Sequence, residues 1–306
     1  MQRKRLASGS MGAIIEKWGK LTRFQEDFVR VGKCKLCHLD GQELCDSHYL
    51  PKKLYGVTRA PQLHSPHPVV ISGTGMRQLS DQLRGYVFCR GCEKRLNENG
   101  ERWVLANIPH DDGGPFPLKT ALSTLTPVVV TKDLDLYNVA RVSAFDMEKV
   151  RYFGLSVFWR GAVEEWRTTG GLKAPPVALC AYEEPLRTFL MGTGPVPADI
   201  VLTIDLWHTQ RVFQACYPPT ASHIPECQSY WFYVPGLIFR IYIGAKIPRG
   251  IRLRNAAKNL IGVDVPAIKS IWDIARSQAQ TREITPKMKT MLEEVAAIRS
   301  KQAPKP

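Results

Sequence analysis

The sequence predicts an α+β protein in which a zinc-bound N-terminal module precedes an α+β domain with an antiparallel sheet. Three observations predict this class: two cysteine pairs within the first 92 residues, one long apolar helix pattern near the middle of the chain, and a series of short β-prone runs after it. A chain of 306 residues can bury a substantial core. We therefore expect an N-terminal helical segment (1–30), the zinc module (31–110) and the α+β domain (120–306).

Four of the eight cysteines form two Cys-x-x-Cys pairs, Cys34 with Cys37 and Cys89 with Cys92. A two-residue spacer lets both thiolates of one tight turn face the same tetrahedral ion, so two such turns make a four-thiolate zinc site. A redox dithiol is the competing interpretation, but it accounts for only one pair. The sequence therefore predicts structural zinc held by all four cysteines.

A histidine and a glutamate lie beside these pairs. His48 falls in the segment LCDSHYLPKK, between the two pairs, and Glu93 follows the last cysteine directly. A neutral imidazole held near a metal-stapled turn is a candidate proton acceptor, and an ordinary surface histidine is the alternative. For Glu93 the alternative is a solvated helical residue that pairs with neighbouring cations.

The order of these motifs is specific. Cys-x-x-Cys, then Ser47-His48-x-x-Pro51, then Cys89-x-x-Cys92-Glu93 resembles zinc-stapled members of the HNH, or ββα-metal, endonuclease superfamily. It is more similar to a bacterial group that pairs SHxxP with CxxCE and a later glutamate, here Glu101, than to the standard family. The resemblance covers about residues 30 to 105 and implies a treble-clef-like ββα-metal fold for the module. It also makes bacterial defence a candidate setting.

The resemblance implies a metal-dependent endonuclease that hydrolyses phosphodiester bonds in nucleic acid. His48 matches the general base that deprotonates the attacking water. Glu93 stands where the family's last histidine binds the catalytic metal, and Asp46 or Ser47 takes the place of the acidic residue before the base. The catalytic ion would be Mg²⁺ or Mn²⁺, which prefer oxygen ligands.

The chain departs from the family at three positions. Ser47 stands where most members have Asp or His, Arg84 where they have an asparagine that orients the base, and Glu93 where they have histidine. Asp81 and Gln82 are the nearest substitutes for that asparagine. If the departures mark lost activity, the chain is instead a non-catalytic zinc-module protein that binds nucleic acid or a protein partner.

Basic residues exceed acidic ones, 42 Lys and Arg against 28 Asp and Glu, for a formal net charge of +14. This excess favours a polyanionic partner, because each neutralised phosphate releases counterions. The candidate nucleic-acid contacts lie beside the module's motifs and in the acid-free segment 246–258: Lys52, Lys53, Arg90, Arg249, Arg252 and Arg254. A solvated face is the alternative for the second group.

Beyond residue 120 the apolar pattern changes. Asp146–Trp166 is a helical candidate with Asp146 as its N-cap. The β-prone runs that predict an antiparallel meander are 177–182, 200–207, 211–217, 229–234 and 237–245. Two further helices are expected at 267–277 and 286–299, and the apolar face of the last is a candidate surface for the rest of the core, a second subunit or a protein partner.

No apolar run approaches the roughly 20 residues that span a bilayer. The basic start MQRKRLASGSMG leads into an amphipathic, charged segment, unlike the apolar centre of a secretory signal. We therefore expect a cytoplasmic protein without membrane association.

Overall fold

The computed structural model describes residues 30–57, 69–72, 75–78, 82–109, 116–207, 216–225 and 227–264. Within them the chain mixes helices with sheets whose strands pair antiparallel, with one parallel pair. Several predicted features lie outside the described residues: the N-terminal helical segment up to residue 29, the helices at 267–277 and 286–299, and Asp81.

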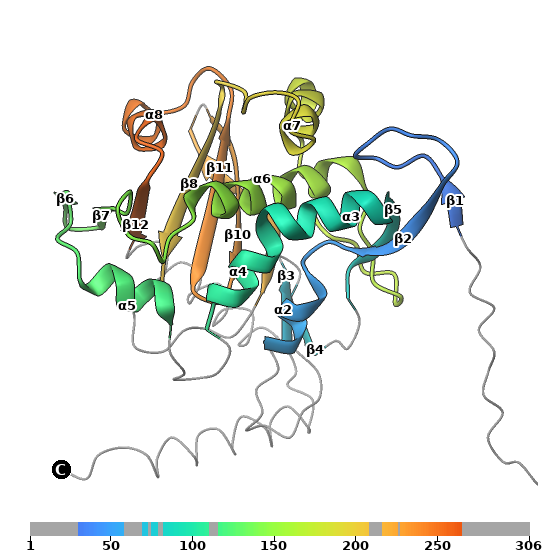
Figure 1. Cartoon of the computed structure of the whole chain (residues 1–306), viewed down its shortest axis with the longest axis horizontal. Coiled ribbons are helices and arrows are strands. Elements are labelled where there is room, and N and C mark those ends of the chain that lie inside the picture. Colours follow the sequence, from blue (N-terminus) through green and yellow to red (C-terminus); the bar gives the residue numbers. More distant parts are fainter. Residues whose placement is uncertain are drawn as a thin grey trace, which may run out of the picture.

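The N-terminal module is built on a three-stranded sheet in the order β1–β2–β5 (Figure 1). Both outer strands pair antiparallel with β2, and the register shifts between the pairs made by Leu44 and Asp46. A separate hairpin, β3–β4, accompanies the sheet. The bounds are β1 (Arg30–Gly32), β2 (Gln42–His48), α2 (Lys52–Val57), β3 (Val69–Ser72), β4 (Gly75–Gln78) and β5 (Arg84–Cys89).

A helical stretch follows β5 without a break. It consists of α3 (Arg90–Leu96), the π-helical turn η2 (Asn97–Glu101) and α4 (Arg102–Asn107). The Asn99-Gly100 pair resembles a helix end, yet the helix continues through it. A Cβ on Gly100 would lie only 2.8 Å from the backbone nitrogen of Phe153, so glycine lets this helix contact its neighbour closely.

The second region is a seven-stranded sheet in the order β6–β7–β12–β8–β11–β10–β9. All neighbours pair antiparallel except β12 with β8, which is parallel. The strands are β6 (Val129–Val130), β7 (Leu134–Asn138), β8 (Ile200–Leu206), β9 (Tyr217–Ile224), β10 (Cys227–Val234), β11 (Leu237–Ile243) and β12 (Leu260–Asp264). The helical elements are α5 (Pro117–Ser123), α6 (Met147–Val163), η3 (Cys180–Tyr182), α7 (Glu183–Leu190) and α8 (Arg249–Ala256).

The antiparallel part of this sheet agrees with the predicted meander in β8, β10 and β11. The run at 177–182 is not a strand: it ends in the 3₁₀ turn η3, which follows Pro175-Pro176. Most of the predicted run 211–217 lies outside the described residues; β9 begins at Tyr217 and continues through Pro218 and Pro219. Proline cannot donate to a strand ladder and is therefore confined to edge strands, which is the position β9 occupies.

The helix α6 joins the two regions. It begins as predicted, with the Asp146 carboxylate accepting a hydrogen bond from the Lys149 N–H at 3.1 Å. Its residues are buried nearly all the way round, because the α3–η2–α4 helix covers one side and the large sheet covers the other (Figure 1). On the sheet side a Cβ at Gly154 would lie 2.7 Å from the Phe239 ring. Buried side chains of both regions therefore form one continuous core.

Candidate metal centre and buried polar cluster

The four predicted cysteines meet at one point. Cys34 and Cys37 lie in the turn between β1 and β2, while Cys89 ends β5 and Cys92 lies in the first turn of α3. Their sulfur atoms all lie within 4.8 Å of one another, and those of Cys37 and Cys89 are 3.9 Å apart. Zn–S bonds of about 2.3 Å in a tetrahedron place sulfurs about 3.8 Å apart, so the residues fit a zinc ion.

The chemistry of the cluster also suits a metal. Hydrogen bonding with Cys92 lowers the pKa of the Cys34 thiol to about 4, and the same contact raises the pKa of Cys92. The Cys89 N–H donates to the Cys34 sulfur at 3.4 Å, a bond that stabilises a thiolate. Since four sulfurs converge rather than two, the cluster is positioned as a structural zinc site and a lone redox pair does not explain it.

The second region supports the first cysteine turn directly. The Arg187 guanidinium, on α7, donates to the Leu36 carbonyl at 2.7 Å and forms a two-bonded pair with Glu184. Leu36 lies between the two cysteines of the turn and is fully buried. Metal binding and the docking of α7 are therefore physically connected.

His48 ends β2 opposite Arg84 of β5. Burial lowers the pKa of His48. The positive charges of Arg84 and Lys52 lower this pKa further, whereas Asp46 and the neighbouring Gln82 oppose the change. The imidazole is therefore neutral at pH 7. Asp46 does not stand free beside it, because its carboxylate forms an ion pair with Arg84 at 2.8 Å.

Ser47 faces the other side of β2, since successive strand residues alternate. It is 1% exposed; its hydroxyl accepts from the Phe88 N–H at 3.3 Å and donates to the Cys45 carbonyl at 3.3 Å. On the same side lies Glu93, where burial raises the pKa of the carboxyl while Arg160 and Ser47 oppose the rise. The structure thus groups Ser47 with Glu93 and groups Asp46 with His48.

A buried arginine of α6 connects these groups. Arg160 is 2% exposed; it forms an ion pair with Glu101, and it donates to the backbone carbonyls of His48 and Tyr49, each at 3.3 Å. Burial lowers the pKa of Arg160, but Glu101 and Glu93 outweigh it and the guanidinium stays charged. The Arg160 guanidinium therefore compensates the charge of Glu101 and Glu93 and also binds the backbone at His48.

The cluster leaves polar atoms without partners. Among the described residues, Glu93 Oε1, Arg160 Nε and the Tyr49 hydroxyl are buried and make no hydrogen bond. Burial raises the pKa of Glu93 and Glu101 is paired with Arg160, so the unpaired carboxyl oxygen of this cluster is Glu93 Oε1. Among the described residues, the four cysteines are the group of three or more potential ligands placed to hold a metal ion.

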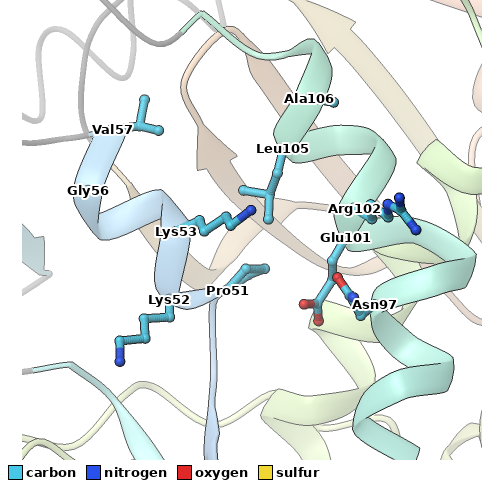
Figure 2. Close-up of a pocket in the computed structure, with 10 residues that line it drawn as sticks. All are labelled: Pro51, Lys52, Lys53, Gly56, Val57, Asn97, Glu101, Arg102, Leu105 and Ala106. Atoms are coloured by element: carbon cyan, nitrogen blue, oxygen red, sulfur yellow. The ribbon is translucent and has the colours of Figure 1, made fainter.

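A groove opens next to this cluster, between α2 and the η2–α4 helix (Figure 2). Its volume is about 900 Å³. The lining residues are Pro51, Lys52, Lys53, Gly56, Val57, Asn97, Glu101, Arg102, Leu105 and Ala106. Glu101 therefore belongs to both the buried cluster and the groove.

The remaining predicted nucleic-acid contacts have different surroundings. Arg90 and Arg249 are exposed, at the starts of α3 and α8. Arg252 donates to the carbonyls of Gly244, Ala245 and Ile247, at 3.0, 2.8 and 3.3 Å. Arg254 pairs with the buried Asp205 at 2.6 Å. The last two arginines hold the fold around β8 and β11, so their charge is largely engaged within the protein.

Sequence reasoning missed Arg160. The available signal was a lone cation inside the apolar stretch FGLSVFWRGAV, since a charged side chain within a buried helix needs a partner. No sequence rule names that partner, because Glu101 is 59 residues away.

Comparisons with protein-family models, with curated proteins and with solved structures found no match for this chain. Among the described residues, no helix is both long enough and apolar enough to cross a membrane.

Proposed function

We propose that this protein is a metal-dependent endonuclease whose site combines His48 with the cluster of Glu93, Glu101 and Arg160. The observation that carries the proposal is the position of Arg160. Its guanidinium bonds the His48 backbone on one side and Glu101 on the other, within the same group of charges as Glu93. The cysteine cluster and the cluster of Glu93, Glu101 and Arg160 lie in the same module as His48, whose imidazole is on the opposite face of β2 from Ser47 and Glu93.

His48 is the proposed general base. Its lowered pKa keeps the imidazole unprotonated at neutral pH, so it can take the proton of a water molecule as the water oxygen attacks phosphorus. The P–O bond to the 3′ oxygen breaks, and that oxygen takes a proton from solvent. Gln82 lies near enough to His48 to raise its pKa, and its Oε1 makes no hydrogen bond in the structure, so it is the proposed orienting residue in place of the family's asparagine.

The proposed metal ligands differ from those that the resemblance implies. Asp46 is paired with Arg84, and the Ser47 hydroxyl is engaged with the backbone, so neither is left for a metal. Glu93 offers an oxygen instead, since its Oε1 makes no hydrogen bond, and Glu101 would offer a second one beside the Arg160 guanidinium that it already pairs with. A divalent ion there would stabilise charge that develops on the phosphate and the leaving oxygen.

The test is cleavage of plasmid DNA, circular single-stranded DNA and structured RNA with Mg²⁺ or Mn²⁺ by the full-length zinc-loaded protein. His48→Ala should lower the rate about 100-fold or more, because general-base catalysis contributes roughly 10²–10⁴. His223→Ala is the matched control, since this exposed histidine of β9 should not affect the rate. Equal cleavage by both variants would refute the role of His48.

A non-catalytic nucleic-acid-binding protein is the second candidate. The observation that favours it is the ion pair that withdraws Asp46, together with the guanidinium already seated between the carboxylates. Wild-type protein that binds nucleic acid but cleaves none of the three substrates with either ion would decide for this candidate.

A further inference from the structure

The groove between α2 and the η2–α4 helix carries an excess of positive charge. Lys52, Lys53 and Arg102 line it and are exposed, and among the described residues none of them has an ion-pair partner. Its one acidic residue, Glu101, is already paired with Arg160. In Figure 2 Lys53 extends into the groove, while the charged ends of Lys52 and Arg102 extend away from it at the two edges. This excess of positive charge around the groove favours a polyanion there.

The groove also has apolar walls. Pro51 and Val57 lie on the side of α2, and Leu105 and Ala106 lie on α4. In Figure 2 the Lys53 side chain extends from α2 toward Leu105, so its charge lies next to the apolar surface. A ligand that fills such a space presents negative charge and a flat apolar body together, which is the chemistry of a nucleotide.

The size of the groove selects between paired and unpaired nucleic acid. At about 900 Å³ it falls within the roughly 300–1,000 Å³ of pockets that hold one small ligand. Bases within a duplex stay stacked and paired, so a duplex could touch the lysines but could not place bases against Leu105 or Ala106. An unpaired strand can do both.

The groove leads to the proposed site. Pro51 follows His48 by three residues, and the Glu101 carboxylate lies in the groove while it pairs with the arginine that holds the His48 carbonyl. From this arrangement we infer that the groove is a binding subsite for one or two nucleotides of a single nucleic-acid strand. The inference rests on the proposed function for its choice of a nucleic acid over other polyanions, and it names the substrate class of that site.

Binding can be measured without cleavage. The protein is full-length, zinc-loaded His48→Ala without added Mg²⁺ or Mn²⁺, and the probes are a fluorescein-labelled 20-nucleotide single strand and its duplex, read by fluorescence anisotropy. The single strand should bind at least about tenfold more tightly than the duplex. A polyphosphorylated peptide of equal charge serves as competitor and should displace the strand poorly.

Two variants test the groove itself. Lys53→Glu should weaken single-strand binding about tenfold or more and make the dependence of log K on log[salt] less steep by about 0.7. Ala106→Trp fills the groove without a change in charge and should weaken single-strand binding by a similar factor. Lys94→Glu is the control, because it makes the same charge reversal on an exposed lysine of α3 outside the groove. Its single-strand affinity should stay within about twofold of the parent protein, apart from the long-range effect of the charge on the salt dependence.

The outcomes separate this inference from the proposed function. Single-strand affinity unchanged by both groove variants would overturn the inference, as would a duplex or the phosphopeptide that binds equally well. Circular dichroism and zinc content are measured to check that each variant is folded. If Ala106→Trp does not fold, Lys53→Glu still tests the inference, because it changes only an exposed side chain. Because no cleavage is measured, a wild type that cleaves nothing but binds single strands in the groove refutes the nuclease and leaves the subsite in place.

Discussion

Replacement of Arg160 by methionine should destabilise the protein by about 3–5 kcal/mol. Methionine keeps much of the apolar volume but removes the charge that compensates Glu101, whose side chain is 12% exposed, and Glu93, whose Oε1 is buried. Loss of one partner from a buried ion pair costs roughly 3–5 kcal/mol, since the other charge stays buried without compensation. The two 3.3 Å bonds to the His48 and Tyr49 carbonyls add to this loss.

The assay is chemical denaturation followed by circular dichroism and tryptophan fluorescence, analysed as a double-mutant cycle. Arg160→Met combined with Glu101→Gln should recover much of the loss, because the second change removes the stranded charge. Arg167→Met is the control, since Arg167 pairs with Glu165 on the surface and such pairs contribute less than about 1 kcal/mol. A loss below about 1 kcal/mol for Arg160→Met, or a strictly additive double variant, would refute the reasoning.

Three further predictions concern the metal centre, the base and the helix contact. Cys89→Ser should lower the zinc content per chain, measured by mass spectrometry, whereas Cys180→Ser, at an exposed cysteine outside the cluster, should not. The cleavage rate should fall only below about pH 6.5, because burial lowers the pKa of His48 and the imidazole must be unprotonated. A histidine NMR titration and the pH–rate profile check this prediction. A cleavage rate that already falls well above pH 6.5 would contradict it. Gly100→Ala should destabilise the protein by about 1–3 kcal/mol in denaturant, because its Cβ meets the Phe153 backbone, whereas Gly91→Ala in α3 meets nothing within 4 Å and should be neutral or stabilising.

The cysteine pairs show what a sequence can predict well. Spacing alone brings each pair to one turn, and a tetrahedral ion requires the two turns to meet, so convergence of the four sulfurs could be predicted without knowledge of the intervening chain. The start of α6 is a second case, because its N-cap is a local interaction between Asp146 and a residue three positions on.

Contacts between distant segments could not be predicted in this way. The pairing of Asp46 with Arg84 depends on the register of β2 against β5, and that register shifts along the pair. The contact of Arg160 with the His48 carbonyl depends on how α6 packs against the module. Local sequence patterns give neither the strand register nor the packing of α6. For this reason the sequence did not predict that Asp46 pairs with Arg84 or that Glu101 pairs with Arg160.

The position of α6 has a consequence for dissection of the chain. A fragment that ends near residue 110 would lose the helix that packs against Gly100, and with it Arg160, the ion-pair partner of Glu101. Such a fragment would keep every residue of the two cysteine turns and still be poorly soluble. Deletion experiments on this protein should therefore preserve both halves and rely on point substitutions.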